Sequence, residues 1–164
     1  MNFQKIICFV FLLIAFNGVY GQRIRRTNKF NSYKDHVHEF GYAINLSYLR
    51  YEKSVAPQLH LHYTRYLTQY FSLGLGYSGI YDSHYHNTLN LETSFRLNQL
   101  IFSLKPGVVI KSRKGETVCL YSIGFESNYE FEISDAVHVG PMAEIDIVQD
   151  DINYLLGFHM GLTF

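Results

Sequence analysis

The sequence predicts an all-β fold, an eight-stranded antiparallel up-and-down transmembrane β-barrel with short loops. The first observation is a period of two: from residue 37 onward, segments of about ten to fifteen residues alternate apolar with polar or small side chains. The second is composition, because 16% of the residues are aromatic, with 14 Tyr, 13 Phe and no Trp. The third is the segment Ile152–Phe164, which is apolar at every second position and ends on an aromatic residue. In a bilayer such a segment would close a barrel with its apolar side outward.

Short turn clusters divide this region into eight expected strands. They lie at residues 38–51, 57–67, 70–81, 88–97, 100–111, 117–132, 137–148 and 152–164. Successive side chains of a strand point to opposite faces, so each segment has one apolar face and one face of Gly, Ser, Asn and Thr. No segment shows the 3.6-residue period of an amphipathic helix. We therefore expect residues 37–164 to form a single barrel domain.

The solvent that the apolar face contacts distinguishes two architectures. A soluble barrel would turn this face inward, whereas a membrane barrel turns it outward. Residue size favours the membrane barrel, because a narrow lumen needs small side chains and a few paired charges. The aromatic residues gather near the strand ends, as at the two interfaces of a membrane. One group is Tyr48, Tyr77, Tyr81 and Tyr121, and the other is Phe40, Phe71, Phe95, Phe102, Phe131 and Phe164.

Two prolines oppose this interpretation. Pro106 and Pro141 fall in the middle of strands, and a closed barrel has no free edge for a residue that lacks an N–H donor. Each proline adjoins a glycine, Gly107 or Gly140. We therefore expect a local β-bulge at each position.

The amino-terminal residues predict a secretory signal peptide at 1–21. Lys5 precedes the apolar run Ile6–Phe16, and small or neutral residues lead to a cleavage point after Gly21. This run is shorter than the roughly 20 residues that a spanning helix needs. Basic residues follow the cleavage point at once, so a retained signal anchor is the alternative.

Residues 22–36 form a basic leader that we expect to be disordered. From residue 22 to residue 35 there are five basic residues and one acidic residue, although the whole chain has a net charge of zero. A basic arm could also bind nucleic acid or anionic lipid, but no other feature supports a nucleic-acid partner. Once the signal is removed Cys119 is the one remaining cysteine, so no intrachain disulfide is expected.

The signal peptide, the eight amphipathic strands and the terminal phenylalanine resemble the small outer-membrane β-barrel proteins of Gram-negative bacteria. The similarity is greatest to the porin-like "outer membrane protein beta-barrel" chains of Bacteroidota, and it covers residues 37–164. It implies an outer-membrane location in which lipid surrounds the barrel. It also implies that both termini, together with the leader, lie in the periplasm. The loops near 52–56, 82–87, 112–116 and 149–151 would then face outward from the cell. The closing strand is similar to the signal that the barrel-assembly machinery recognises, here Tyr154, Phe158, Met160, Leu162 and Phe164.

Histidine pairs are the first candidates for chemistry. Residues that are two positions apart on a strand share a face, so we expect His60 and His62 both to point into the lumen. His84 and His86 are expected on the adjacent outer loop. Clustered imidazoles can bind zinc, copper or nickel. We favour the simpler interpretation that these four histidines are hydrogen-bonded polar filling, with no cofactor.

Six charged residues near mid-strand are the second candidates, and they share the polar face. They are Glu92, Arg96, Lys105, Glu126, Glu144 and Asp146. A catalytic carboxylate set or an ion path is possible in principle, but we favour a salt-bridged plug in the lumen. No nucleophile elbow, phosphate loop or zinc-ligand spacing occurs, so we expect no enzyme activity.

The predicted function is that of a non-enzymatic, monomeric outer-membrane barrel with a structural or envelope-interaction role and a lumen filled by side chains. One alternative is a small pore or transporter for ions or small solutes. The other is a secreted soluble barrel that binds an apolar ligand.

Overall fold

The computed structural model describes residues 37–82, 86–113, 116–149 and 151–164. The predicted signal peptide, the basic leader and His84 lie outside these residues. The described part of the chain forms strands joined by turns: β1 (His38–Leu49), β2 (Ser54–Tyr66), β3 (Phe71–Ile80), β4 (His86–Leu97), β5 (Leu100–Arg113), β6 (Glu116–Tyr129), β7 (Phe131–Glu132), β8 (Val137–Val148) and β9 (Asp151–Thr163). No helix among the described residues is long and apolar enough to cross a membrane.

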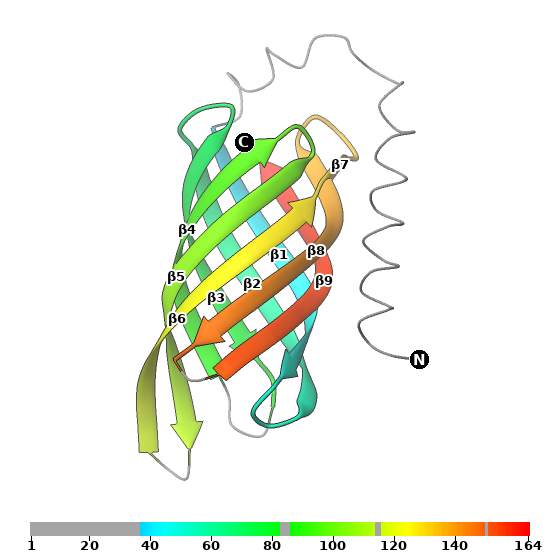
Figure 1. The fold of residues 1–164 in the computed structure, drawn as a ribbon. Coiled ribbons are helices and arrows are strands. Elements are labelled where there is room, and N and C mark those ends of the chain that lie inside the picture. The colour runs from blue at the N-terminus through cyan, green and yellow to red at the C-terminus, as the bar shows by residue number, and fades with distance from the viewer. Residues whose placement is uncertain (1–36, 83–85, 114–115, 150) are drawn as a thin grey trace. The chain divides into compact units, whose positions relative to one another are not determined.

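The strands form a closed antiparallel barrel of eight strands, as predicted (Figure 1). β6 and β7 are two parts of one strand, because Glu130 separates them while the register with β8 continues unchanged. Asn128 pairs with Met142 on one side of this interruption, and Phe131 pairs with Val139 on the other. The predicted strand at 117–132 therefore corresponds to β6 and β7 together.

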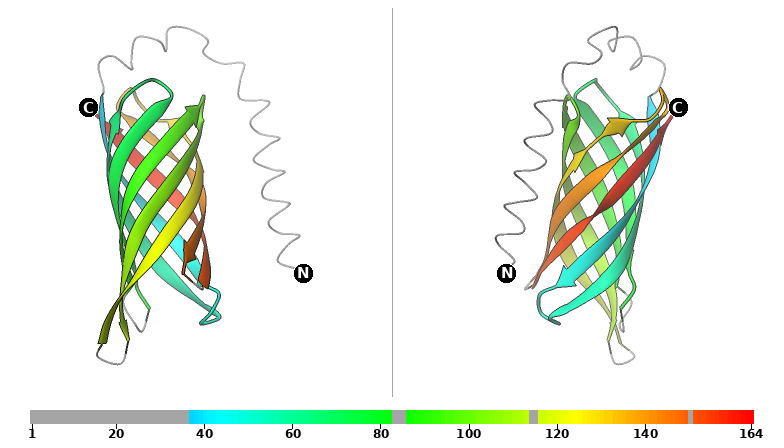
Figure 2. Two further views of the ribbon diagram at one scale, coloured as in Figure 1. Left: turned by 60° about the vertical axis from the view of Figure 1, so that its left-hand side comes forward. Right: turned by 90° about the vertical axis from the view of Figure 1, so that its right-hand side faces the viewer.

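The first and last strands meet along the whole barrel wall. β1 pairs with β9 from Glu39 and Thr163 to Leu49 and Asn153, and the two strands lie side by side in Figure 2. Beyond the paired strand ends, the backbone N–H of His38 donates to the carbonyl oxygen of Phe164 at 3.0 Å. The predicted closing strand thus completes the barrel against the first strand.

The two ends of the barrel differ in what they carry. We call the end with His38, Thr163 and the β2–β3, β4–β5 and β7–β8 turns the terminal end, and the opposite end the hairpin end. At the hairpin end the β5–β6 hairpin extends past its neighbours, as Figure 1 shows. This hairpin continues to the pair Arg113 and Glu116, whereas the pairing of β6 with β8 begins only at Ser122 and Val148.

The apolar face of the sheet points outward and the polar face points into the lumen. On β1, Ile44 and Leu46 are each 62% exposed, whereas the intervening Asn45 and Ser47 are buried. The same alternation continues through the barrel, and it puts apolar residues on the outer surface. The structure therefore has the outward apolar face that residue size predicted, and not the inward one of a soluble barrel with an apolar interior.

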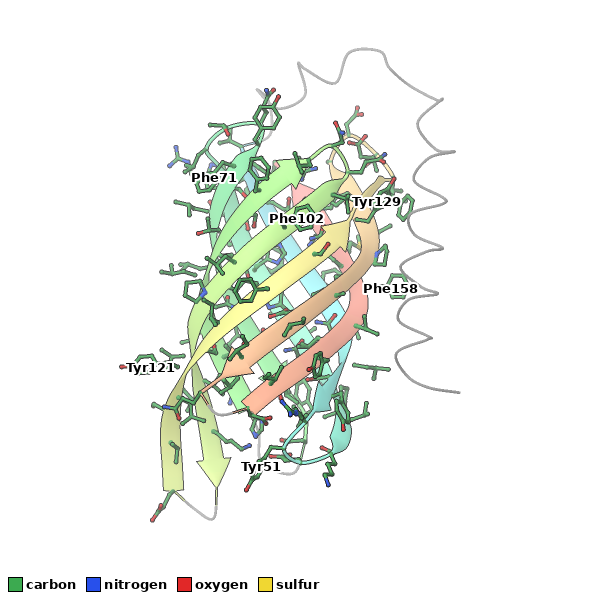
Figure 3. The ribbon with its side chains drawn as sticks, in the orientation of Figure 1. Tyr51, Phe71, Phe102, Tyr121, Tyr129 and Phe158 are labelled. Carbon is green, nitrogen blue, oxygen red and sulfur yellow. The ribbon has the colours of Figure 1, made fainter. Side chains whose placement is uncertain are left out.

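The two expected groups of aromatic residues lie at opposite ends. Phe71 and Phe102 flank the terminal end, while Tyr121 lies towards the hairpin end (Figure 3). Tyrosine also occurs at the terminal end, since Tyr129 lies there with Gln99 as the acceptor of its hydroxyl hydrogen bond.

The β-bulges expected at Pro106 and Pro141 were predicted wrongly, because no residue is inserted at either position. Pro106 pairs in register with Ile123 of β6, and Pro141 pairs in register with Phe158 of β9. On its other side each proline faces a short interruption of the pairing that leaves the register unchanged. The strands accommodate the missing N–H donor by omitting ladder bonds on one side only.

Candidate functional site

The lumen is the candidate functional site, because buried charged and polar side chains line it from one end of the barrel to the other. The inward face of the barrel includes Glu39, His60, His62, Glu92 and Lys105, each exposed by less than a tenth. Charges rarely occupy such positions unless they are paired. The pairing therefore decides what the lumen can do.

A lysine with two carboxylates occupies the middle of the barrel. The Nζ atom of Lys105 donates to Glu126 Oε2 at 2.8 Å and to Glu144 Oε2 at 2.7 Å. Lys105 pairs across the sheet with Gly124, whose missing side chain leaves the space that the Glu144 carboxylate enters. The side chain of Lys105 is only 1% exposed, so solvent barely screens the charges of this group.

A group of four histidines lies between this lysine and the terminal end. The ring centroids of His62 and His159 are 5.0 Å apart, those of His138 and His159 are 5.3 Å apart, and those of His60 and His62 are 5.4 Å apart. Two carboxylates accompany the rings. His60 Nε2 lies 2.9 Å from Glu92 Oε1.

The second of these carboxylates, Glu39, faces three of the four rings. Its Oε1 atom lies 3.1 Å from His62 Nε2, 3.5 Å from His138 Nε2 and 3.8 Å from His159 Nε2. Its Oε2 atom accepts a hydrogen bond from the Tyr66 hydroxyl. Three imidazoles thus converge on one carboxylate oxygen whose partner oxygen is already held.

An arginine pair lies nearest the terminal end. Arg96 Nη1 lies 2.7 Å from Glu130 Oε2, and Arg96 Nη2 donates to the Tyr66 hydroxyl at 3.0 Å. The guanidinium carbon also lies 5.6 Å from the centre of the Tyr66 ring. Glu130 is the residue between β6 and β7, so the interruption of that strand supplies the counter-ion of Arg96.

The hairpin end holds a separate group of charges. Lys111 Nζ donates to Glu52 Oε1 at 2.8 Å, and His86 Nε2 lies 3.6 Å from Asp82 Oδ2. A cavity of about 60 Å³ adjoins His86, Lys111 and Asp146. A second cavity, of about 20 Å³, lies at the terminal end against Glu39 and His159.

The structure divides the six predicted charges among several groups. Lys105, Glu126 and Glu144 contact one another as described above. Arg96 instead pairs with Glu130, and Glu92 with His60. Among the described residues, no ion pair joins Asp146 to another charge, although it lines the cavity at the hairpin end.

Three of the four histidines predicted as metal candidates, His60, His62 and His86, belong to the described residues. His60 and His62 point into the lumen beside Glu92, as the pairing of positions two apart required. His86 lies at the hairpin end among acidic residues, and His84 lies outside the described residues. The three described histidines of the predicted set therefore lie in two separate environments.

Sequence reasoning missed four lumen residues, Glu39, Glu130, His138 and His159. All four occupy inward positions of the period-two pattern, and this parity was the available signal. The two histidines lack a histidine partner two residues away, so only the pairing register of β8 with β9 brings them together.

Four of the predicted assembly-signal residues lie on the outward face of β9, and the fifth, Phe164, directly follows this strand. Tyr154, Phe158, Leu162 and Phe164 are exposed, and Met160 accepts a hydrogen bond from the Tyr42 hydroxyl at 3.1 Å. Phe158 is the most exposed of them, at 72%, and projects from mid-barrel in Figure 3.

No protein-family model and no curated protein matches the chain. Solved structures do match it at low sequence identity. Neisserial surface protein A superposes with a TM-score of 0.56 at 9% identity, over 77% of this chain and 96% of that one. Ail, the attachment invasion locus protein of Yersinia pestis, gives 0.52 at 13% identity, over 78% and 97%.

Two further structures give the same result. The N-terminal β-barrel domain of Pseudomonas aeruginosa OprF gives a TM-score of 0.53 at 13% identity, over 77% of this chain and 97% of that one. A de novo designed transmembrane β-barrel gives 0.54 at 13% identity, over 79% and 97%. The chain therefore has the fold of the small eight-stranded outer-membrane β-barrels.

Proposed function

We propose that this protein is an integral β-barrel of the outer membrane of a Gram-negative bacterium, without enzyme activity and with a structural or envelope-interaction role. The observation that carries this proposal is the inverted burial, with apolar side chains outside and charges inside. Leu46 and Leu75 are each 62% exposed, whereas Lys105 is fully buried. In water such a surface would aggregate, but in a bilayer it contacts lipid along the whole wall. The assignment to Bacteroidota rests on the resemblance of the sequence alone.

The short connections favour a structural role over a large recognition surface. On the hairpin end the turn between β1 and β2 spans residues 50–53, and the connection between β3 and β4 spans residues 81–85. The hairpin β5–β6 is the one described element that extends past its neighbours on that end. Its exposed residues Val118 and Tyr121 would be the first contact for a partner outside the cell.

Fractionation tests the membrane proposal directly. We expect the protein in the detergent-extracted outer-membrane fraction. We also expect a heat-modifiable band, because a closed barrel stays folded in unboiled gel samples. Recovery from the periplasm without detergent would contradict the proposal and favour the soluble barrel.

The filled lumen makes the barrel non-conducting in this proposal. Lys105 with its two carboxylates lies at mid-height, and the two cavities of about 20 and 60 Å³ lie on either side of it. Roughly 10–15 Å³ suffices for one water molecule, so each cavity holds only a few waters. We expect no conductance steps from the purified barrel in planar bilayers. Regular steps would instead establish the pore function.

Removing the terminal aromatic residue tests the role of the closing strand in assembly. Phe164 stacks on His38 with 5.9 Å between ring centroids and exchanges two backbone hydrogen bonds with it. These contacts lie at an exposed strand end, so deletion of Phe164 should cost only about 1 kcal/mol of stability. We nevertheless expect a severalfold loss of barrel in the outer membrane. Phe40→Ala is the matched control, because Phe40 is a similarly exposed aromatic at the same end. Normal membrane levels after the deletion would contradict an assembly role.

A further inference from the structure

Three histidines and one glutamate in the lumen are spaced like the ligands of a metal ion. The Nε2 atoms of His62, His138 and His159 lie 3.1, 3.5 and 3.8 Å from Glu39 Oε1. Zinc–ligand distances of about 2.0–2.2 Å place the ligands of a tetrahedral site roughly 3.3–3.5 Å apart. The three separations from Glu39 fall around that spacing, and the ligand atoms of Glu39, His138 and His159 lie within 4.8 Å of one another. The four residues lie on β2, β1, β9 and β8, which are consecutive neighbours in the barrel wall.

Hydrogen bonding leaves several of these nitrogen atoms without a partner. His159 is only 4% exposed, yet neither of its ring nitrogens has a hydrogen-bond partner among the described residues. Nε2 of His138 likewise makes no well-directed hydrogen bond, although the carboxylate oxygen Glu130 Oε1 lies 3.2 Å from it. A buried polar atom without a partner is unfavourable and rare. Coordination of a cation would occupy these lone pairs.

Two glycines keep the space between the ligands open. Gly41 and Gly161 pair with each other across the β1–β9 seam, with His62 beside Gly41 and His138 beside Gly161 in the same cross-strand row. A Cβ atom at Gly41 would lie against the ring of His62 and 2.8 Å from His159 Nε2. A Cβ atom at Gly161 would lie against the ring of His138 and 3.0 Å from Glu39 Oε1.

We propose that this group is a binding site for one Zn²⁺ ion or a similar divalent transition metal. His62, His138 and His159 would bind through Nε2, and Glu39 would bind through Oε1. Imidazole nitrogen and carboxylate oxygen are ligands that Zn²⁺ accepts in four-coordinate sites. The proposal does not depend on the outer-membrane location, because all four ligands belong to the barrel itself.

The surroundings of the ligands suit a metal site. The Tyr66 hydroxyl donates to Glu39 Oε2, which leaves Oε1 directed at the imidazoles. Glu92 Oε2 lies 3.9 Å from His62 Nδ1, the ring nitrogen that the proposed site leaves free. An outer carboxylate in this position orients the ligating imidazole and strengthens its binding. Glu130 Oε1 lies 3.2 Å from His138 Nε2 itself, so the ion would replace this contact. The cavity of about 20 Å³ lined by Glu39, His62 and His159 supplies a route for the ion.

A metal at this position would connect the two sides of the seam between the first and last strands of the barrel. Its ligands lie on both sides of the β1–β9 seam, where no covalent connection crosses the barrel wall. An ion bound only by the folded barrel stabilises it in proportion to the logarithm of the metal concentration. The site would therefore act as a clamp on the closed barrel.

The test uses the tag-free full-length chain, refolded in detergent, stripped with chelator and titrated with ZnCl₂. We expect one equivalent of Zn²⁺ to bind at micromolar or lower concentration. Co²⁺ should give the strong visible absorption of a four-coordinate ion, and Zn²⁺ should raise the temperature at which the folded gel band disappears. Failure of the folded wild-type barrel to bind either ion would overturn the proposal.

Single substitutions decide which residues hold the ion. His138→Gln and His159→Gln should each weaken Zn²⁺ binding by at least about 100-fold. His60→Gln is the matched control, because His60 is a buried lumen histidine whose Nε2 faces Glu92 rather than Glu39. Loss of binding in His60→Gln with retention in His138→Gln would assign the ion to the other group and overturn the proposal.

X-ray absorption of the zinc-loaded wild-type barrel decides the question even if the variants do not fold. A shell of three imidazoles and one carboxylate supports the site. A shell with fewer than two imidazoles, or six oxygen ligands, contradicts it.

Discussion

Lys105→Met is expected to destabilise the barrel by about 3–5 kcal/mol, because it leaves two buried carboxylates without their counter-ion. The Nζ atom of Lys105 contacts Glu126 at 2.8 Å and Glu144 at 2.7 Å, and its side chain is 1% exposed. Methionine fills a similar volume, so the change removes the charge and leaves the packing nearly intact. Urea unfolding, followed by circular dichroism and by loss of the unboiled folded band, measures the effect.

Two further variants separate the buried charge from other effects of the substitution. Lys111→Met is the matched control: Lys111 lies on the same strand and pairs with Glu52 at the same 2.8 Å, but its side chain is 21% exposed. An exposed pair of this kind contributes about 0–1 kcal/mol. The triple variant Lys105→Met, Glu126→Gln, Glu144→Gln removes all three charges and should recover most of the stability. Equal losses of stability in Lys105→Met and Lys111→Met would show that burial of the ion pair does not determine its contribution to the stability of the barrel.

For the described strand residues, the sequence predicted whether a side chain points inward or outward, but it did not predict which side chain it contacts. A period of two fixes which residues face the lumen, because a shift by one residue would turn every apolar side chain inward. The strand predicted at 137–148 has the bounds of β8, and Glu92, Lys105 and Glu144 face inward as expected. The break at Glu130 was not visible, because the alternation continues through it without a change of phase.

Which inward side chains contact one another depends on the register between strands, and the alternation of inward and outward residues does not determine that register. Arg96 lies on β4 and Glu130 lies between β6 and β7, which do not pair with β4, yet the two residues form a 2.7 Å ion pair inside the lumen. The register of β8 with β9 brings His138 near His159, and the register of β1 with β9 brings both histidines near Glu39. The histidine pairs two residues apart were more conspicuous in the sequence, but a closed barrel brings inward residues together across strands as readily as along them.

The prolines show why a local rule failed. A missing N–H donor suggested an inserted residue at Pro106 and Pro141, because a closed barrel has no free edge. The barrel instead keeps its register and omits pairs on one side, and the adjoining glycine brings the strand close to its neighbour there. A Cβ atom at Gly107 would lie 2.6 Å from the carbonyl oxygen of Leu89. At Gly140 the approach to the neighbouring strand is closer still.

Gly140→Ala is therefore the second substitution from which we expect a large effect. Its Cβ atom would collide with the carbonyl oxygen of Tyr129 and would lie 2.7 Å from the carbonyl carbon of the same residue. Both obstacles are backbone, which cannot move aside as a flexible side chain can, so β8 must separate from β6 and β7. Overpacking costs about 1–3 kcal/mol, and we expect a loss at the upper end of that range.

The position of this clash determines what else the substitution changes. Glu130 carries the counter-ion of Arg96, so displacement of its backbone should loosen the terminal end of the lumen as well as the barrel wall. Gly79→Ala is the matched control, because a Cβ atom there would meet nothing nearer than 3.6 Å. We expect Gly79→Ala to refold and migrate like the wild type, and Gly140→Ala to give less folded band and a lower urea midpoint. Equal midpoints for the two variants would show that β8 does not need this close approach to complete the barrel.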